Sequence, residues 1–306
     1  MIADTRHDWA RRPERGALPL MRLMVWFALR LGRPAARLFL YPICTYYLIF
    51  ARASRRASCA YLSRALERPA TLGDIFQNFL CFGSCILYRV FLLNDRIDLF
   101  DIHIHGEELV SNVLKRGGGC VLFGAHFGSF EVARAVGRRE RNLPITLVMY
   151  EENARKIRAA IASINPHLSI DVIGLGTSSS MIAVAERLEQ GHFVGILPDR
   201  SLGEEDQLLH AFLGHPAHFP RGPFRMAIML GYPVLFMAGV YGGERRYDIF
   251  FEKLLDPASS PTDKRPSRRG RSEQLEVVMY RYIDRLEYYC RMAPYNWFNF
   301  YDFWKP

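Results

Sequence analysis

The sequence predicts an α/β protein in which helices flank a mainly parallel sheet. From residue 100 onward, short β-like runs alternate with single helical stretches, a pattern typical of parallel strands joined by crossover helices. Half of the 306 residues are apolar, so the chain can bury a sizeable core. The residues in front of this region form basic amphipathic helices, which we predict to associate with a membrane.

The expected elements follow one another in a regular order. Helical patterns cover about 17–67, with breaks at Gly32–Pro34 and near Ala51–Arg55, and Thr71 opens a helix that reaches about Leu93. The β-like runs are 100–104, 120–125, 145–150, 169–175, 193–198, 233–241 and 247–254. The later helical runs are 106–115, 129–139, 151–163, 178–190, 221–230 and 272–292. A long loop is expected after 198, and the last two strands are candidates for an antiparallel edge.

The positive charge lies almost wholly in the first 67 residues. They hold twelve arginines and four acids, a net +8 of the total +9. The longest charge-free run within these 67 residues, Leu38–Ala51, has 14 residues, fewer than the roughly 20 that span a bilayer as a helix. Arginine mixed with aromatic residues fits helices that lie in the interface of an anionic membrane. We therefore divide the chain into a membrane-associating segment, 1–67, and a main domain, 68–306; helices simply docked on the core are the alternative.

The stretch GGGCVLFGAHFGSFEVARAVG holds the best candidates for chemistry. A buried strand delivers His126, and Glu131 falls in the first turn of the next helix. In that arrangement the carboxylate can fix the imidazole tautomer, and the free nitrogen can take a proton from a hydroxyl. Backbone N–H groups at the helix start are candidate donors for an oxyanion. From the residues alone, a structural histidine capped by a carboxylate is the commoner outcome of such a pattern.

Several other chemistries lack their motifs. The sequence has no G-x-S-x-G nucleophile elbow, no G-x-G-x-x-G after its first strand and no P-loop. His103 and His105 share one face of a strand, but no third ligand is evident, so no metal is expected. The six cysteines form no C-x-x-C pair and are predicted to be reduced and buried. No nucleic-acid partner is expected.

Four ordered blocks carry a resemblance to a known superfamily. GAHFGSFE (124–131) resembles the His-x4-acid block of glycerolipid and lysophospholipid acyltransferases. Three further stretches are similar to blocks of bacterial lipid A late acyltransferases: ILPDRSLGEED (196–206), AFLGHPAHFPRGPFRMA (211–227) and GYPVLFMAGVY (231–241). The closing WFNFYDFW (297–304) resembles the branch of predicted acyltransferases found with aryl-polyene pathways.

The resemblance implies an O-acyltransferase without cofactor or metal. Its donor would be a fatty or aryl-polyene acyl thioester of acyl carrier protein or coenzyme A. Its acceptor would be a lipid hydroxyl. The enzyme would lie on the cytoplasmic face of a bacterial inner membrane that contains anionic lipids. A thioesterase that uses the same residues on water is the rival enzyme, and a basic lipid-binding protein is the non-enzymatic rival.

The same resemblance implies a role for each site residue. His126 would be the general base and Glu131 its orienting carboxylate, as catalytic residues. Asp199 and Arg200 would line the acceptor or headgroup site, with a simple turn salt bridge as the alternative.

Two further residues, Phe127 and Gly128, would shape the entrance for the thioester. One departure concerns the segment after the fourth strand, GLGTSSS (174–180), which lacks the arginine expected for a phosphorylated glucosamine. We therefore expect a less anionic alcohol as acceptor.

Overall fold

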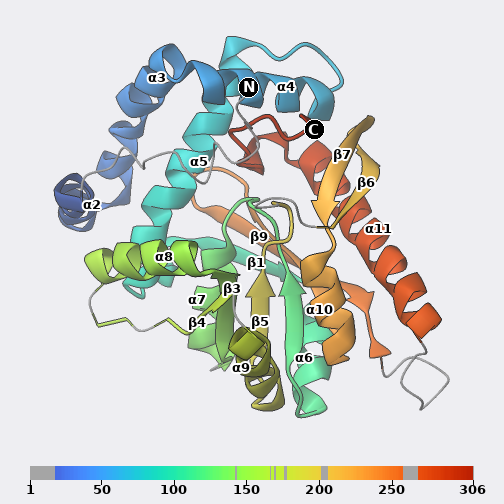
Figure 1. Cartoon of the computed structure of the whole chain (residues 1–306). Coiled ribbons are helices and arrows are strands. Elements are labelled where there is room, and N and C mark those ends of the chain that lie inside the picture. Colours follow the sequence, from blue (N-terminus) through green and yellow to red (C-terminus); the bar gives the residue numbers. More distant parts are fainter. Residues whose placement is uncertain are drawn as a thin grey trace.

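The computed structural model describes residues 18–141, 143–165, 167–168, 170–175, 178–200, 206–257 and 268–305 (Figure 1). Its strands are β1 Asp101–His105, β2 Cys120–Phe123, β3 Ile145–Tyr150, β4 Val172–Leu175, β5 Phe193–Ile196, β6 Gln207–Phe212, β7 His215–Pro220, β8 Val234–Tyr241 and β9 Arg246–Leu255. Its α-helices are α2 Leu18–Leu38, α3 Leu40–Phe50, α4 Arg52–Ala65, α5 Leu72–Leu93, α6 Glu107–Lys115, α7 Phe130–Arg141, α8 Glu151–Ile164, α9 Ser178–Glu189, α10 Gly222–Leu230 and α11 Arg268–Met292.

The main sheet confirms the predicted α/β class. Seven strands lie in the order β1-β9-β8-β2-β5-β3-β4, and only the β8–β9 pair is antiparallel. The expectation of an antiparallel edge was wrong in one respect, because β9 lies inside the sheet. The edge strand on that side of the sheet is β1, a short strand with alternately exposed residues that pairs in parallel with β9. A short, polar edge strand offers little surface for pairing with another chain.

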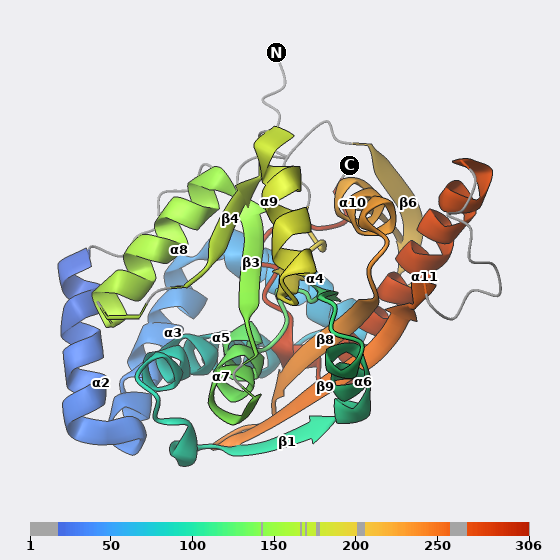
Figure 2. The ribbon, with the colours of Figure 1, turned by 90° about the horizontal axis from the view of Figure 1, so that it is seen from below.

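Helices cover both faces of the sheet. Alternate residues of β2 point to opposite faces, and Phe123 packs against Phe224 of α10 and Tyr282 of α11, with ring centroids 4.8 and 6.1 Å away. On the other face, Leu122 lies with Val136 of α7 beside a small cavity. Figure 2 shows α8 and α9 on opposite sides of β3 and β4. Both faces of the central strands are therefore buried, as their continuous apolar runs predict.

A hairpin occupies part of the region expected to be a loop. Strands β6 and β7 pair antiparallel, with Phe212 opposite His215, so only Leu213 and Gly214 form the turn. Both turn residues have positive φ, 50° and 77°, as a two-residue hairpin turn requires. The prediction of a long loop over this segment was wrong because leucine is rarely a turn residue.

The N-terminal helices pack around α5. Gly32, with φ 79° and ψ 172°, breaks the regular geometry of α2 at the predicted place, and Ala51 separates α3 from α4. Thr71 and Asp74 form the capping box that starts α5. Among the described helices, α5 is long and apolar enough to cross a membrane, yet 67% of that stretch is buried within the protein. We therefore describe α5 as a core helix of the protein.

Candidate active site

His126 and Asp199 meet at the C-terminal edge of the sheet. They follow two adjacent parallel strands, β2 and β5, in which Phe123 pairs with Ile196. The Nδ1 atom of His126 lies 2.8 Å from Oδ1 of Asp199, and the His126 backbone N–H donates to Oδ2 at 3.0 Å. Asp199 thus binds both the ring and the backbone of the histidine, which fixes the orientation of the imidazole.

Glycines at the ends of the strands make this close arrangement possible. The ring of Phe130 lies directly over Gly195, where a Cβ would collide with it. A Cβ on Gly124 would come within 2.9 Å of the Leu197 side chain. Gly128 has a φ of 56°, and a Cβ there would collide with the Gly239 carbonyl. The turn from strand to helix around His126 therefore depends on residues without a side chain.

The C-terminal segment closes over this edge as a strap, defined as residues 294–300. The Trp297 indole donates to Oδ2 of Asp199 at 3.2 Å, and the Phe298 N–H donates to the His126 carbonyl at 2.8 Å. From the other side, Tyr61 donates to the Pro294 carbonyl at 2.7 Å. The strap links an N-terminal helix, the sheet and the site.

Electrostatics favour a neutral imidazole. Burial lowers the pKa of His126 below its ordinary value, and the positive charges of Arg200 and Arg89 lower it further, against the opposing effect of Asp199. Burial alone would raise the pKa of Asp199, but its interactions with His126 and Arg200 hold it below the ordinary value. An ionised carboxylate can only accept, so the Nδ1–H of His126 donates to Asp199 and Nε2 carries the lone pair. The histidine side chain remains 31% exposed, so a substrate can approach it.

Comparison with known proteins decides the family. Residues 76–306 match the profile of the bacterial lipid A biosynthesis acyltransferase family. The chain belongs to that family. It is therefore an enzyme that acylates lipids. No curated protein matches the chain.

A search of solved structures also finds a similar chain. The 1-acyl-sn-glycerophosphate acyltransferase PlsC from Thermotoga maritima shares 14% identity, with a TM-score of 0.36. The match covers 88% of this chain and 98% of that one. A TM-score this low supports no statement about function.

In this acyltransferase, the side chain of Glu131 pairs with a residue other than His126, its expected partner. Its carboxylate forms a buried ion pair with Arg134, one turn further along α7. No hydrogen bond joins Glu131 to His126 among those of the described residues, and the ring faces Asp199 instead. Two carboxylates therefore flank the start of α7, and only one of them contacts the imidazole. The catalytic role of Glu131 stays a prediction.

The two residues predicted to shape the thioester entrance have structural contacts. Phe127 is buried, with its ring 6.2 Å from that of Tyr289. The Gly128 N–H donates to the Asn296 carbonyl at 2.7 Å, and the next N–H, of Ser129, donates to Gly239 at 2.8 Å. These two backbone N–H groups are therefore used by the fold. The expectation that N–H groups at the start of α7 hold an oxyanion stays a prediction.

Arg200 lies beside the histidine and is held by the strap. Its Nε donates to Oδ1 of Asn299 at 2.8 Å, and Nη2 donates to the Phe298 carbonyl at 2.9 Å. Burial lowers its pKa, but a guanidinium stays charged in proteins. The sequence placed Asp199 and Arg200 at the site but gave no signal for Trp297 as their neighbour.

The remaining polar candidates lie away from this edge. Both histidines lie on the edge strand β1. His103 contacts Asp101 at 3.1 Å, and His105 contacts Asp248 of β9 at 3.2 Å. Over the ranges that the structure describes, no three histidine, cysteine or acidic side chains cluster as metal ligands.

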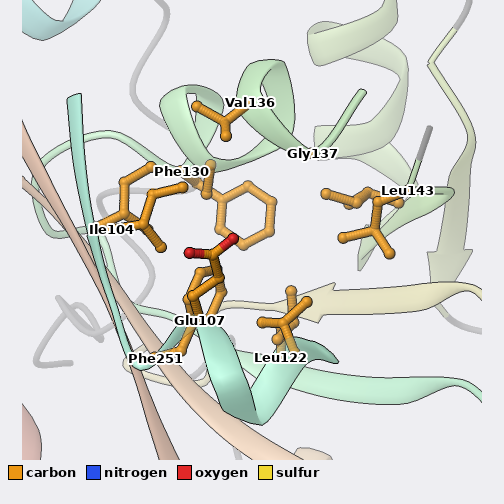
Figure 3. Close-up of a pocket in the computed structure, with 12 residues that line it drawn as sticks. Ile104, Glu107, Leu122, Phe130, Val136, Gly137, Leu143 and Phe251 are labelled. Atoms are coloured by element: carbon orange, nitrogen blue, oxygen red, sulfur yellow. The ribbon is translucent and has the colours of Figure 1, made fainter. Parts of the chain in front are cut away.

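A small apolar cavity lies under α7, next to the site (Figure 3). Its volume is about 30 Å³, and Phe130, Leu122 and Val136 are among its lining residues. It is too small for a fatty acyl chain, and the Phe130 ring stands against Gly195, between the cavity and the strand end. Acyl-chain binding therefore needs another surface.

Proposed function

We propose that this acyltransferase moves an acyl chain from a thioester of acyl carrier protein or coenzyme A to a hydroxyl of a lipid acceptor. The observation that carries this proposal is the neutral, partly exposed imidazole of His126, oriented by the buried carboxylate of Asp199. A thioester is already activated, so the reaction needs a base and charge stabilisation but no cofactor or metal of its own.

The steps follow from the geometry of the pair. Asp199 accepts a hydrogen bond from Nδ1–H, which leaves Nε2 to take the proton of the acceptor hydroxyl. The oxygen attacks the thioester carbonyl, the tetrahedral intermediate collapses, and the C–S bond breaks. The proton on Nε2 then passes to the leaving thiolate. An ester and a free thiol result, and His126 is again neutral.

The oxyanion of the intermediate needs a donor other than the amides of Gly128 and Ser129, which bind within the fold. The Arg200 guanidinium is the cation that the strap holds beside His126, and its charge acts on the imidazole. We assign it this stabilising role. Preorganised charge of this kind typically contributes a few kcal/mol to a transition state.

The surface of α2 and α3 supports a place at a membrane. Large apolar side chains are exposed on these two adjacent helices: Trp26, Phe27, Leu29, Leu31, Leu38, Phe39, Tyr41, Ile43, Tyr46, Tyr47, Ile49 and Phe50. Arg30 lies 5.9 Å from the Trp26 ring and adds positive charge. So large an exposed apolar patch marks an interaction surface, and aromatic residues with arginine suit the interface of anionic lipids. We propose the cytoplasmic face of a bacterial inner membrane.

A product analysis tests the proposed reaction. The purified protein is incubated with labelled palmitoyl-coenzyme A and a lysophospholipid in anionic vesicles. We expect a labelled diacyl lipid, lost in His126→Asn and retained in His103→Asn, a matched change at an exposed histidine. Free fatty acid without acylated lipid would support the thioesterase instead. Vesicle binding without any turnover would support a lipid-binding protein.

A further inference from the structure

The carboxylate of Asp199 has a hydrogen-bond partner besides His126. Asp199 is fully buried, and three N–H groups of the described residues donate to its side chain. Two of them belong to His126, the ring at 2.8 Å and the backbone at 3.0 Å. The third is the indole N–H of Trp297, 3.2 Å from Oδ2. The indole therefore ties this carboxylate to a part of the protein other than the histidine that it orients.

The indole of Trp297 is held in one orientation by other aromatic rings. The side chain is almost fully buried. The rings of Tyr61 and Phe303 contact it edge-on, with centroids 4.8 and 4.9 Å away, and the Phe212 ring does so at 5.4 Å. These three residues belong to α4, to the end of the chain and to β6. A ring packed in this way cannot turn freely, so its N–H is a donor of fixed direction.

The backbone of the strap is fixed by two buried amide side chains. Nδ2 of Asn78, on α5, donates to the Trp297 carbonyl at 3.2 Å, and Oδ1 of Asn78 accepts from Ser58 of α4 at 2.8 Å. The side chain of Asn296 exchanges two hydrogen bonds with the backbone of Tyr241 at the end of β8, at 2.8 and 3.1 Å. The position of Trp297 is therefore set by α4, α5 and the sheet together.

This support matters because the carboxylate has to hold the imidazole in one place. A base acts efficiently when a third group orients it, and that group must itself be fixed. Without the indole, Oδ2 of Asp199 would keep only the backbone N–H of His126 as a donor among the described residues. A buried carboxylate oxygen that loses a donor is destabilised, and the carboxylate then has more freedom to turn.

We infer that Trp297 is a positioning residue for acyl transfer: its indole N–H fixes the carboxylate of Asp199 and, through it, the ring of His126. This inference rests on the proposed role of His126 as the base. The strap is then part of the catalytic machinery and not only a cover of the core. Packing alone would need the aromatic ring of Trp297 but not its N–H. Removing the N–H while keeping the ring therefore separates the two roles.

Loss of the indole N–H should change the pKa of His126 in a defined direction. A donor to a carboxylate offsets part of its negative charge. Without that donor, Asp199 attracts the imidazolium more strongly, so the pKa of His126 should rise. A substitution at position 297 leaves in place the other titratable groups that interact electrostatically with His126 or Asp199, which are Arg89, Arg200, Tyr282, Cys290 and Tyr301.

Two replacements of Trp297 test the inference in the full-length protein. Trp297→Phe removes the N–H together with part of the ring, and benzothienylalanine at this position keeps the shape of the indole and removes only the N–H. In both we expect kcat to fall about tenfold with KM within about twofold of wild type. The rise of kcat/KM with pH should move to higher pH. The control Trp304→Phe removes an indole that donates to the Phe212 carbonyl at 3.2 Å, and it should behave as wild type.

Unchanged kcat and an unchanged pH profile in the benzothienylalanine protein would overturn the inference, whether or not Trp297→Phe folds. An equal loss of kcat in Trp304→Phe would also overturn it, because packing of the aromatic cluster would then be the cause. Nitrogen NMR of His126 without substrate separates this inference from the proposed reaction. A raised pKa of His126 in the Trp297 variants would support the link between the two residues. If the wild-type protein then transferred no acyl chain, that result would contradict the reaction alone.

Discussion

The C-terminal edge of the sheet and the pair of helices α2–α3 present opposite kinds of surface. At the sheet edge, both carboxylate oxygens of Asp199 have hydrogen-bond partners, and the strap residue Phe298 donates to the His126 carbonyl. On α2 and α3, a dozen large apolar side chains face outward, and their contacts are non-directional. Chemistry depends on single atoms in fixed positions, whereas attachment to a lipid surface depends on summed apolar area and charge. Single substitutions should therefore disable the first region, and only multiple substitutions the second.

The largest effect is expected at His126. Replacement by alanine removes the base, so kcat/KM for acyl transfer should fall by roughly 10² to 10⁴. Binding to anionic vesicles should not change, because His126 is not one of the exposed apolar side chains of α2 and α3. Turnover within threefold of wild type would show that another group takes the proton.

The two carboxylates should differ in their effects. Asp199→Asn removes the acceptor for Nδ1–H and should lower kcat by roughly 10², with less change in KM. Glu131→Gln keeps its shape beside Arg134 but weakens a buried ion pair. Its main effect should therefore be a lower melting temperature, with a smaller loss of kcat once the protein is folded. Thermal unfolding and kinetics on the same samples separate these effects.

Membrane attachment should respond to several substitutions together. The triple change of Tyr46, Ile49 and Phe50 to serine removes apolar area from α3, and vesicle binding should weaken about tenfold or more. Turnover of a soluble short-chain acceptor should be retained. The matched control changes Ile182, Leu209 and Val277, which are exposed on other elements. Equal losses in both triple variants would show that α3 is not the attachment surface.

Substitutions test the predicted boundary at residue 67 better than a deletion. Removing residues 1–67 would also remove Tyr61, which is buried and hydrogen-bonded to the strap at Pro294. A truncated protein would thus lose part of the support of its active site together with its apolar surface.

The smallest effect concerns pH. A general base must be neutral, so kcat/KM should rise with pH through the pKa of His126. Burial and the two arginines lower this pKa below the ordinary 6.5, so wild-type activity should already be near its plateau at pH 7. Arg89→Gln removes one of the positive charges and should move the rise to higher pH. An unchanged profile would show that Arg89 does not act on the imidazole.

Local patterns in the sequence predicted most of the fold. The capping box of Thr71 and Asp74, the break at Gly32 and the alternation of strands and helices are short-range signals, and the structure follows them. The hairpin β6–β7 was missed because its turn uses Leu213. The predicted strand order was incomplete for a different reason. Strand β9 lies between β1 and β8, and the residues that pair in β1 and β9, such as Asp101 and Arg246, are 145 positions apart in the sequence.

The site was predictable only in part. The position of His126 at a strand end follows from the buried run before it. The choice between two carboxylates does not, because Asp199 reaches the ring through the pairing of β2 with β5. Trp297 comes from the strap, and nothing local in the sequence marks it as a partner of Asp199. The aryl-polyene branch stays a prediction, since the family match does not distinguish it.

Nitrogen NMR of the His126 ring tests the central claim most directly. In ¹⁵N-histidine-labelled protein at pH 7, assigned with His126→Asn, we expect a neutral ring with the proton on Nδ1 and a free lone pair on Nε2. Asp199→Asn should disturb this tautomer, and Glu131→Gln should leave it intact. A proton on Nε2, a charged ring at pH 7, or a tautomer that depends on Glu131 and not on Asp199 would contradict the account.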